Sequence, residues 1–435
     1  MLTETETSRD PAVAQALDVV RELAAGYDRR DVAVRFWDGT VWQADPAGEP
    51  KFTLVLKDRG SLRDMLWPPS PMSFGKAFIY GAIDIEGDLA AFAHFGRHLE
   101  GTSRRLSLAG RLGLGWKIIR LPKVERVRAG RKQAELSGKV HSLERDRDAI
   151  RYHYDLSNDF FRIALGPDMV YTSAIWESDD EDLETAQYRK LDLLYTKLRL
   201  KPGERLLDIG CGWGTPLMYA AKKYGAECVG VTISERQAEW ATKQIADAGL
   251  ADRCRIELRD YRELTERESF DKIVMIEVGE HFGFDEFHGY FRKCFDLLKP
   301  GGQLMIQQIT VFGQERRPAI RAVGNAFVFP DGELVPVSWL LKCAENAGFD
   351  VRDVESIREQ YPKTLDRWLR NVEANKEQVI QLTDEASYQT FRLYFATAKY
   401  GFLTNVYNLH HMLFVKPDNF ASPVPESRRD WYSGR

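Results

Sequence analysis

Residues 206–214 read Leu-Leu-Asp-Ile-Gly-Cys-Gly-Trp-Gly, an apolar run that leads directly into a glycine-rich turn. The apolar run predicts a buried strand of a parallel sheet, and the glycines predict a tight loop that lets the backbone approach a ligand. The residues after the loop are patterned as a helix, whose N-terminus would face the same ligand. This order of elements, with Asp208 at the end of the strand, predicts a site for a nucleoside-containing ligand.

The segments that follow the loop alternate between predicted strands and helices. We expect strands over 228–232, 270–277 and 303–311, a helix over 235–248, and a last strand at the edge of the sheet over 405–415. Such alternation is typical of α/β proteins, in which helices cover both faces of a parallel sheet. The expected fold is a Rossmann-like sheet with its ligand at the carboxyl ends of the strands.

The length of 435 residues, of which 44% are hydrophobic, is enough for two or three domains. Residues 1–101 predict a small α+β domain without a cluster of catalytic residue types, and we interpret it as an accessory module for lipid or membrane docking. Residues 102–148 are interpreted as a basic linker, residues 149–417 as the domain that carries the glycine loop, and residues 418–435 as a loose tail.

The net charge of −4 is unevenly distributed along the chain. From Arg104 to Arg151 there are 14 Lys or Arg and 5 Asp or Glu, a local charge of +9. Such a segment suits the phosphates of anionic phospholipids or of nucleic acid, and a solvated linker is the plainer alternative. Because charge alone is no RNA-binding motif, we expect no nucleic-acid partner.

Five scattered cysteines without a Cys-x-x-Cys pair predict neither a disulfide framework nor a metal site, and they fit a reducing compartment. The polar residues Met1 to Asp10 do not have the pattern of a signal peptide. No run approaches the ~18 apolar residues that a membrane-spanning helix needs. We therefore expect a cytoplasmic protein that associates peripherally with the inner face of the membrane.

The glycine loop favours S-adenosylmethionine over other nucleoside ligands. It is one residue shorter than the dinucleotide pattern Gly-x-Gly-x-x-Gly, and the next strand ends in Thr232-Ile233-Ser234 instead of an acidic residue. The form Asp208-x-Gly210-x-Gly212 is common in S-adenosylmethionine-dependent methyltransferases. Asp260-Tyr261 stands where an acidic and aromatic pair would surround the adenine, with plain core packing of Tyr261 as the alternative.

Several further segments occur in an order typical of one family: residues 152–161, 168–174, 231–237, 280–283 and 361–368, which read YHYDLSNDFF, DMVYTSA, VTISERQ, EHFG and YPKTLDRW. Together with the glycine loop they closely resemble the cyclopropane-fatty-acyl-phospholipid synthase and mycolic acid methyltransferase family, over residues from about 150 to 415. The resemblance implies a class I methyltransferase sheet with helical lid insertions. Residues 81–88 resemble the accessory domain of the phospholipid-acting bacterial branch, which the mycolic-acid branch lacks.

This family transfers the methyl group of S-adenosylmethionine to a cis double bond inside a lipid chain. An alkene is a poor nucleophile and the intermediate is a carbocation, so the site must exclude water, present apolar or aromatic walls and supply a base. By resemblance, the residues expected to hold the cofactor are Tyr171, Thr172, Asp208, Gly210, Gly212, Gly214, Thr232, Gln237, Asp260 and Tyr261.

The expected base site departs from the family pattern. The resemblance implies a bicarbonate ion as base, held by a cysteine, a glutamate, a histidine and a tyrosine. Here Ser173 replaces the cysteine and Gln307 the histidine, whereas Glu280 and Tyr361 remain. Serine and glutamine can hydrogen-bond an anion but add no positive charge. Either bicarbonate binds in a rearranged way, or Glu280 acts directly or through water.

A displaced base changes the product. Loss of a proton from the new methyl group closes a cyclopropane while the cation sits on the far carbon. After a hydride shift to that carbon, the same loss gives an exocyclic methylene, the precursor of a methyl branch. The altered residues favour the methylene product, with the cyclopropane as the alternative.

The partners expected from the resemblance are unsaturated phospholipid acyl chains, an anionic membrane surface and a reductase that acts on the product; a homo-oligomer is compatible with the sequence. Two other classes of function stay open. One is a lipid-binding pseudoenzyme, against which the intact glycine loop argues. The other is a methyltransferase for RNA or a soluble metabolite.

Overall fold

The computed structural model describes residues 10–154, 156–313, 320–419 and 424–432 of the chain. It divides into two compact units. The first comprises Met1–Gln133, Pro318–Val328 and Lys376–Tyr400, and the second comprises Ala134–Arg317, Phe329–Asn375 and Gly401–Arg435. Each unit has its own sheet.

The first unit is an α+β domain around a four-stranded sheet with the order β2-β1-β3-β4. Strands β1 and β3 are parallel, and the other two pairs are antiparallel. The strands are β1 (Val32–Arg35), β2 (Val41–Gln43), β3 (Phe52–Leu56) and β4 (Ile83–Gly87). The helices are α1 (Pro11–Ala24), α2 (Ser61–Leu66), α3 (Pro71–Ile79), α4 (Leu89–Arg105) and α5 (Leu108–Arg120).

Later parts of the chain also belong to the first unit, which the sequence did not predict. They are α12 (Ile320–Phe327), α15 (Lys376–Leu382) and most of α16 (Glu385–Leu403). Arg392 of α16 donates to Asp84 Oδ1 at 3.2 Å and to the carbonyl of Ile85, both on β4. Because hundreds of residues separate these partners in sequence, local patterns carry no sign of the contact.

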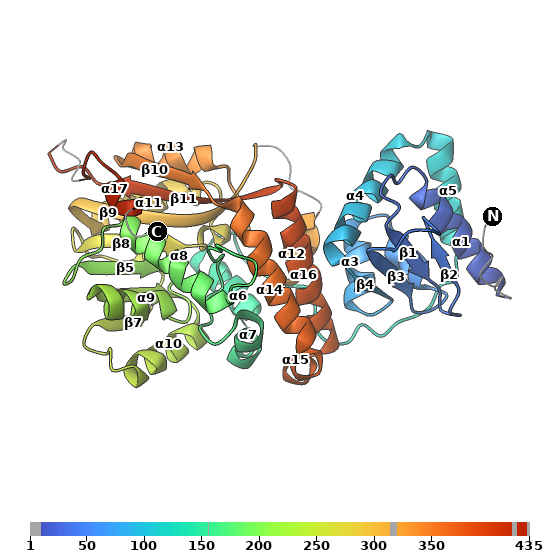
Figure 1. Ribbon diagram of the computed structural model, residues 1–435, viewed down its shortest axis with the longest axis horizontal. Helices are drawn as coiled ribbons and strands as arrows, with labels where there is room; N and C mark the ends of the chain where they lie inside the picture. Colours follow the sequence, from blue (N-terminus) through green and yellow to red (C-terminus); the bar gives the residue numbers. More distant parts are fainter. Residues whose placement is uncertain (1–9, 155, 314–319, 420–423, 433–435) are drawn as a thin grey trace. The chain divides into compact units, whose positions relative to one another are not determined.

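The second unit contains a seven-stranded sheet with the order β10-β11-β9-β8-β5-β6-β7, which Figure 1 shows with helices on both sides. The strands are β5 (Arg205–Ile209), β6 (Glu227–Thr232), β7 (Cys254–Leu258), β8 (Phe270–Ile276), β9 (Leu298–Val311), β10 (Asp350–Ser356) and β11 (Tyr407–Val415). Strand β11 is antiparallel to both neighbours, and the other pairs are parallel. The chain runs outward from β5 and returns on its other side with β8, so the sheet has its topological switch point between these strands.

The expected Rossmann-like fold is confirmed, but the prediction that the last strand lies at the sheet edge is wrong. Strand β11 lies between β10 and β9, and seven consecutive residues from Leu409 to Val415 are buried. A strand that is buried on both faces is a near-continuous apolar run, and this pattern belongs to an interior strand.

Alternate residues of the strands face two separate cores. Leu207 packs with α11 (Glu286–Leu297) and α13 (Val337–Ala347) on one face. Leu206, one residue earlier, packs on the other face with α8 (Leu183–Lys197) and α9 (Thr215–Tyr219). The remaining helices of this unit are α6 (Leu143–Tyr154), α7 (Asn158–Leu165), α10 (Glu235–Asp247), α14 (Tyr361–Ala374) and α17 (Arg429–Tyr432).

The segment expected to be a loose tail contains α17, which is packed against the domain. Trp431 is 4% exposed, and the guanidinium of Arg199 lies 4.9 Å from its ring centroid. Asp430 forms an ion pair with the same arginine at 2.6 Å. Contacts between the Trp431 ring and nearby cations help to dock this helix. The polar residues around Trp431 in the sequence did not predict this packing.

Among the described residues, no helix is both long enough and apolar enough to cross a membrane.

Candidate functional site

The glycine loop after β5 adopts the backbone that its sequence predicts. Gly210 has φ +78°, in the left-handed region that favours glycine. A Cβ atom at this position would lie 2.4 Å from Val278 Cγ2, so the loop and the segment after β8 are in close contact. Gly214 has φ +87° and precedes α9 as its N-cap.

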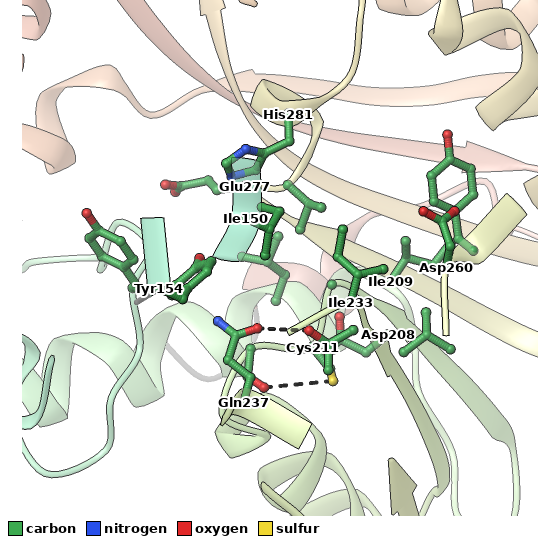
Figure 2. Close-up of a pocket in the computed structure, with 18 of the residues that line it drawn as sticks. Ile150, Tyr154, Asp208, Ile209, Cys211, Ile233, Gln237, Asp260, Glu277 and His281 are labelled. Atoms are coloured by element: carbon green, nitrogen blue, oxygen red, sulfur yellow. Dashed lines mark hydrogen bonds between the residues drawn. The ribbon is translucent and has the colours of Figure 1, made fainter. Parts of the chain in front are cut away.

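One cavity lies against this loop at the carboxyl ends of β5, β6 and β8. Nine of the ten residues predicted to hold the cofactor line it: Tyr171, Thr172, Asp208, Gly210, Gly212, Thr232, Gln237, Asp260 and Tyr261. Figure 2 shows Tyr154 and Glu277 on one side of the cavity and Asp260 on the other. The tenth residue, Gly214, is not part of the lining; its missing side chain leaves room for Ala241 of α10, 2.9 Å from where a Cβ would be.

The side of the cavity beyond β6 is preorganised by side-chain hydrogen bonds. Thr232 Oγ1 donates to Gln237 Oε1 at 2.9 Å, which fixes the amide at the start of α10. The Asp260 carboxylate accepts two hydrogen bonds of 2.9 and 2.8 Å from the guanidinium of Arg262. The Tyr261 ring packs against Phe282 at a centroid distance of 5.0 Å, so it is both core and cavity wall.

A buried lysine that the sequence interpretation missed lies behind the cavity wall. Lys190 is 0% exposed, and its Nζ donates to Thr172 Oγ1 at 2.7 Å. Burial lowers its pKa, while the negative charges of Glu277 and Asp208 oppose that shift. Burial raises the pKa of Asp208, and Lys190 opposes the rise. Lys190 lies four residues from both Ala186 and Leu194 on the buried face of α8, and this helical spacing was the signal that could have revealed it.

The opposite side of the cavity is built around Glu277, which the sequence interpretation also missed. The backbone N–H of Ser173 donates to Glu277 Oε1 at 2.9 Å, and Gln307 Nε2 donates to the same oxygen. The Tyr361 hydroxyl donates to Oε2 at 2.6 Å. Burial raises the pKa of Glu277, while these three donors and Lys190 act in the opposite direction. Three of the four predicted catalytic residues therefore converge on one carboxylate.

Glu277 is the residue directly after β8, and its φ of +54° is uncommon for a residue with a side chain. A strained backbone at the carboxyl end of a strand, beside a ligand cavity, is often part of a functional site. The available sequence signal was an acidic residue that ends the apolar run Phe270–Ile276.

The other predicted catalytic residues differ in detail from expectation. Ser173 contributes its backbone N–H, because its hydroxyl donates to the carbonyl of Ala174 at 3.3 Å. Glu280 Oε1 accepts from the backbone N–H of Ile309 at 3.1 Å, and Glu280 is not in the lining of the cavity. Burial, and then the charge of Glu277, raises the pKa of Glu280 to about 8, which keeps it protonated at neutral pH.

A bicarbonate ion does not fit the residues that the resemblance assigned to it. The Ser173 N–H, the Gln307 amide and the Tyr361 hydroxyl all donate to the Glu277 carboxylate. A second anion at the same donors would meet a negative charge at hydrogen-bond distance, and like charges so close repel strongly.

Comparison with known families shows what this cavity belongs to. Residues 141–412, more than half of the chain, match the family described as mycolic acid cyclopropane synthetase. The chain belongs to this family. Residues 20–95 match a second family, described as a domain of unknown function.

Among the relatives of this family member is a probable fatty acid methyltransferase of Pseudomonas putida, 32% identical over 92% of this chain and 95% of that protein. Cyclopropane mycolic acid synthase 1 of Mycobacterium tuberculosis is 36% identical over 56% of this chain and 88% of that protein. The structure of the cyclopropane synthase MmaA2 from Mycobacterium tuberculosis superposes with a TM-score of 0.60 at 29% identity, covering 62% of this chain and 98% of the other.

As a member of this family, the protein is an S-adenosylmethionine-dependent methyltransferase that modifies lipids. The cavity suits this cofactor because Asp208 and Glu277 are compatible with a sulfonium cation, and the backbone around Gly212 is open to a ligand. When bound, S-adenosylmethionine supplies an electrophilic methyl group. The residues that would hold it are the nine lining residues named above.

Adding a methyl group at Gly210 tests the contact between the loop and the segment after β8. Gly210→Ala forces alanine into a left-handed backbone and also places its Cβ against Val278. Gly212→Ala forces alanine into a left-handed backbone at φ +54° but meets open space, so it changes the backbone preference alone. We expect both variants to lose about 1–2 kcal/mol from the backbone and Gly210→Ala to lose about 1–3 kcal/mol more. Urea unfolding of the apoprotein measures the difference; equal losses would contradict the close contact.

The raised pKa of Glu280 predicts that the stability of the protein depends on pH. Its pKa in the folded protein, about 8, lies above the ordinary value of 4.5, so the folded state keeps a proton that the unfolded chain has lost. The free energy of unfolding therefore falls as the pH rises through this interval. Glu280→Gln removes the effect, and the melting temperature of the variant relative to wild type should rise between about pH 5 and pH 8. The exposed Glu239→Gln is the matched control, and parallel pH profiles for all three proteins would refute the assignment.

Proposed function

We propose that the protein methylates the cis double bond of unsaturated acyl chains in phospholipids and forms a methylene-bearing chain, the precursor of a methyl branch. The observation that carries this proposal is the rearranged reactive side of the cavity, where Ser173, Gln307 and Tyr361 hold a carboxylate of the chain itself. The cyclopropane is the second candidate product, because it forms from the same first step.

The walls of the cavity support reaction at an alkene. Many of the side chains that line the cavity are apolar or aromatic, among them Ile150, Tyr154, Met169, Val170, Tyr171, Ile276, Val278 and Phe282. Behind this wall, Trp368 is 1% exposed and its ring lies 5.3 Å from that of Tyr171. Such walls keep water from a carbocation, and the negative faces of aromatic rings attract it.

The product depends on whether a hydride shift precedes the loss of a proton from the new methyl group. The alkene π electrons form the new carbon–carbon bond and leave a cation on the far carbon. A hydride then shifts to this carbon from the methyl-bearing carbon, which becomes the cation. Loss of a methyl proton then gives an exocyclic double bond. A fixed base on the protein favours one such outcome, because it reaches a defined position. A relative that matches 92% of this chain is named a probable fatty acid methyltransferase, a name that fits either product.

The choice of a phospholipid substrate is supported by residues 81–88, which resemble the accessory domain of the phospholipid-acting branch. The match to the mycolic acid relative takes in 88% of that protein but only 56% of this chain. This chain therefore has a large part outside the match. Completion of a methyl branch from the proposed product would then require a separate reductase that adds hydrogen to the new double bond.

Helix α5 of the first unit suits an anionic membrane surface. Its exposed apolar side chains recur on one face: Leu108, Leu112, Trp116 and Ile119, at 73%, 67%, 56% and 43% exposure. On the other face Leu114 and Ile118 are buried. From Gly101 to Val124 the sequence has 6 Lys or Arg and no Asp or Glu, and one of the six, Lys117, forms ion pairs with Asp18 and Glu22 of α1. An apolar stripe beside cations is typical of helices that lie in a membrane interface. We propose that this face holds the protein on the inner membrane surface.

Removal of two apolar side chains from this face tests membrane docking. Leu112→Ser with Ile119→Ser should weaken binding to vesicles of phosphatidylglycerol and phosphatidylcholine by about tenfold or more, because each side chain loses apolar burial. Val127→Ser, at a position 91% exposed and outside the helix, is the control. Sedimentation with vesicles measures the binding, which added salt should also weaken. Equal binding of variant and control would contradict this surface.

The product is identified by mass spectrometry after incubation with an oleoyl phospholipid and S-adenosylmethionine carrying a trideuterated methyl group. We expect a lipid that retains two deuterium atoms and takes up hydrogen under catalytic hydrogenation that spares cyclopropanes. A dideuterated lipid that resists hydrogenation is the cyclopropane and overturns the methylene proposal. The absence of any labelled lipid, with cofactor binding confirmed by calorimetry, overturns the lipid methyltransferase proposal as a whole.

A further inference from the structure

We propose that the Glu277 carboxylate is the base that takes the proton from the methylated acyl chain, so that this protein needs no bicarbonate ion. The inference rests on the proposed function, and it assigns the reactive step to a side chain of the cavity wall. It applies equally to a methylene and to a cyclopropane product, because both require the loss of a proton from the new methyl group.

The position of Glu277 is the first observation that supports this role. Glu277 lines the same cavity as the glycine loop, and its neighbour Val278 packs directly on Gly210 of that loop. The carboxylate therefore lies in the part of the cavity where β5 and β8 meet, next to the predicted cofactor site. Among the other acidic residues of this region, Glu280 is outside the lining and Asp260 is held by Arg262.

The hydrogen bonds of Glu277 are the second observation. Oε1 accepts from the Ser173 N–H and the Gln307 amide, and Oε2 accepts from the Tyr361 hydroxyl. An ionised carboxylate has about four lone-pair sites, so three donors leave Oε2 able to accept one more proton. The donors hold the anion in place, and the surrounding apolar wall makes it a stronger base than a carboxylate in water.

A histidine behind the site fixes the orientation of the Gln307 amide. His411 Nε2 lies 2.7 Å from Gln307 Oε1, and the two residues are direct neighbours in the pairing of β11 with β9. When His411 Nε2 carries its proton, it donates to the amide oxygen, and the amide nitrogen must then face Glu277. His411 is a positioning residue for the carboxylate.

The proton-transfer step balances without a further reactant. A C–H bond of the transferred methyl group breaks, its electron pair neutralises the carbocation by forming a carbon–carbon bond, and the proton moves to Glu277 Oε2. The proton returns to solvent after the lipid product leaves. No electrons are exchanged with an oxidant or a reductant.

The test compares Glu277→Gln and Glu277→Ala with wild type, using the transfer of labelled methyl groups to lipid in buffer freed of carbon dioxide. Wild type should turn over at the same rate with and without added bicarbonate. Loss of a general base costs about 10²–10⁴-fold, so we expect Glu277→Gln to lose at least about 100-fold in kcat. Formate or bicarbonate should restore part of the activity to Glu277→Ala, which opens space for a small anion, and none to Glu277→Gln. Glu239→Gln, on the exposed face of α10, is the control for the change of charge.

Two further readouts separate a chemical role from a structural one. Calorimetry should show that Glu277→Gln still binds S-adenosylhomocysteine, and carbon-13 NMR of labelled bicarbonate should show binding to Glu277→Ala alone. Activity of wild type that depends on bicarbonate, or near-normal turnover of Glu277→Gln, overturns the inference while the proposed function stands. A wild-type protein that labels no lipid overturns the proposed function, and the inference with it.

Discussion

The carboxylate of Glu277 is the contact on which the reactive side of the cavity depends. It joins four parts of the chain that are far apart in sequence: the segment before α8 through Ser173, the end of β8, the middle of β9 through Gln307, and the start of α14 through Tyr361. Loss of the carboxylate would remove the shared acceptor of three donors, and a buried polar group that loses its partner is costly in a protein interior. One side chain thus defines the geometry of this whole region.

The charges beneath the cavity reinforce the same arrangement. Lys190 is surrounded by the negative charges of Asp208 and Glu277, and its Nζ is anchored by Thr172. A buried cation of this kind is stable only when anions are near, and each anion in turn is easier to bury beside it. The glycine loop and the reactive side are therefore linked electrostatically through a helix, α8, that lies behind both.

The sequence was sufficient for those features that local patterns encode. The strand, glycine loop and helix around Asp208 follow from apolar runs and from backbone preferences, and nearly all predicted cofactor residues line one cavity. Glu277 was missed because its partners Ser173, Gln307 and Tyr361 lie 104, 30 and 84 residues away in sequence. Its importance appears only when β8 and β9 pair and α14 packs beside them.

Two other differences have the same origin. The near-continuous apolar run of β11 indicates only that it is an interior strand, and its place between β9 and β10 depends on long-range pairing. The contribution of Ser173 comes from its backbone N–H, which every residue except proline has, so the residue type carried no information about it. Local chemistry predicted the cofactor side of the cavity, and long-range pairing decided the reactive side.

A base that is part of the chain differs physically from a bound ion. A bicarbonate ion must be captured from solution and loses translational freedom on binding, whereas the Glu277 carboxylate is ordered when the protein folds. The strained backbone at φ +54° shows that folding holds the residue in an unfavourable conformation, which the three donors and the pairing of β8 over-determine. Such a base reaches the acyl chain from one direction only. The timing of proton loss relative to the hydride shift, and with it the choice between a ring and a methylene group, then becomes a property of the fold.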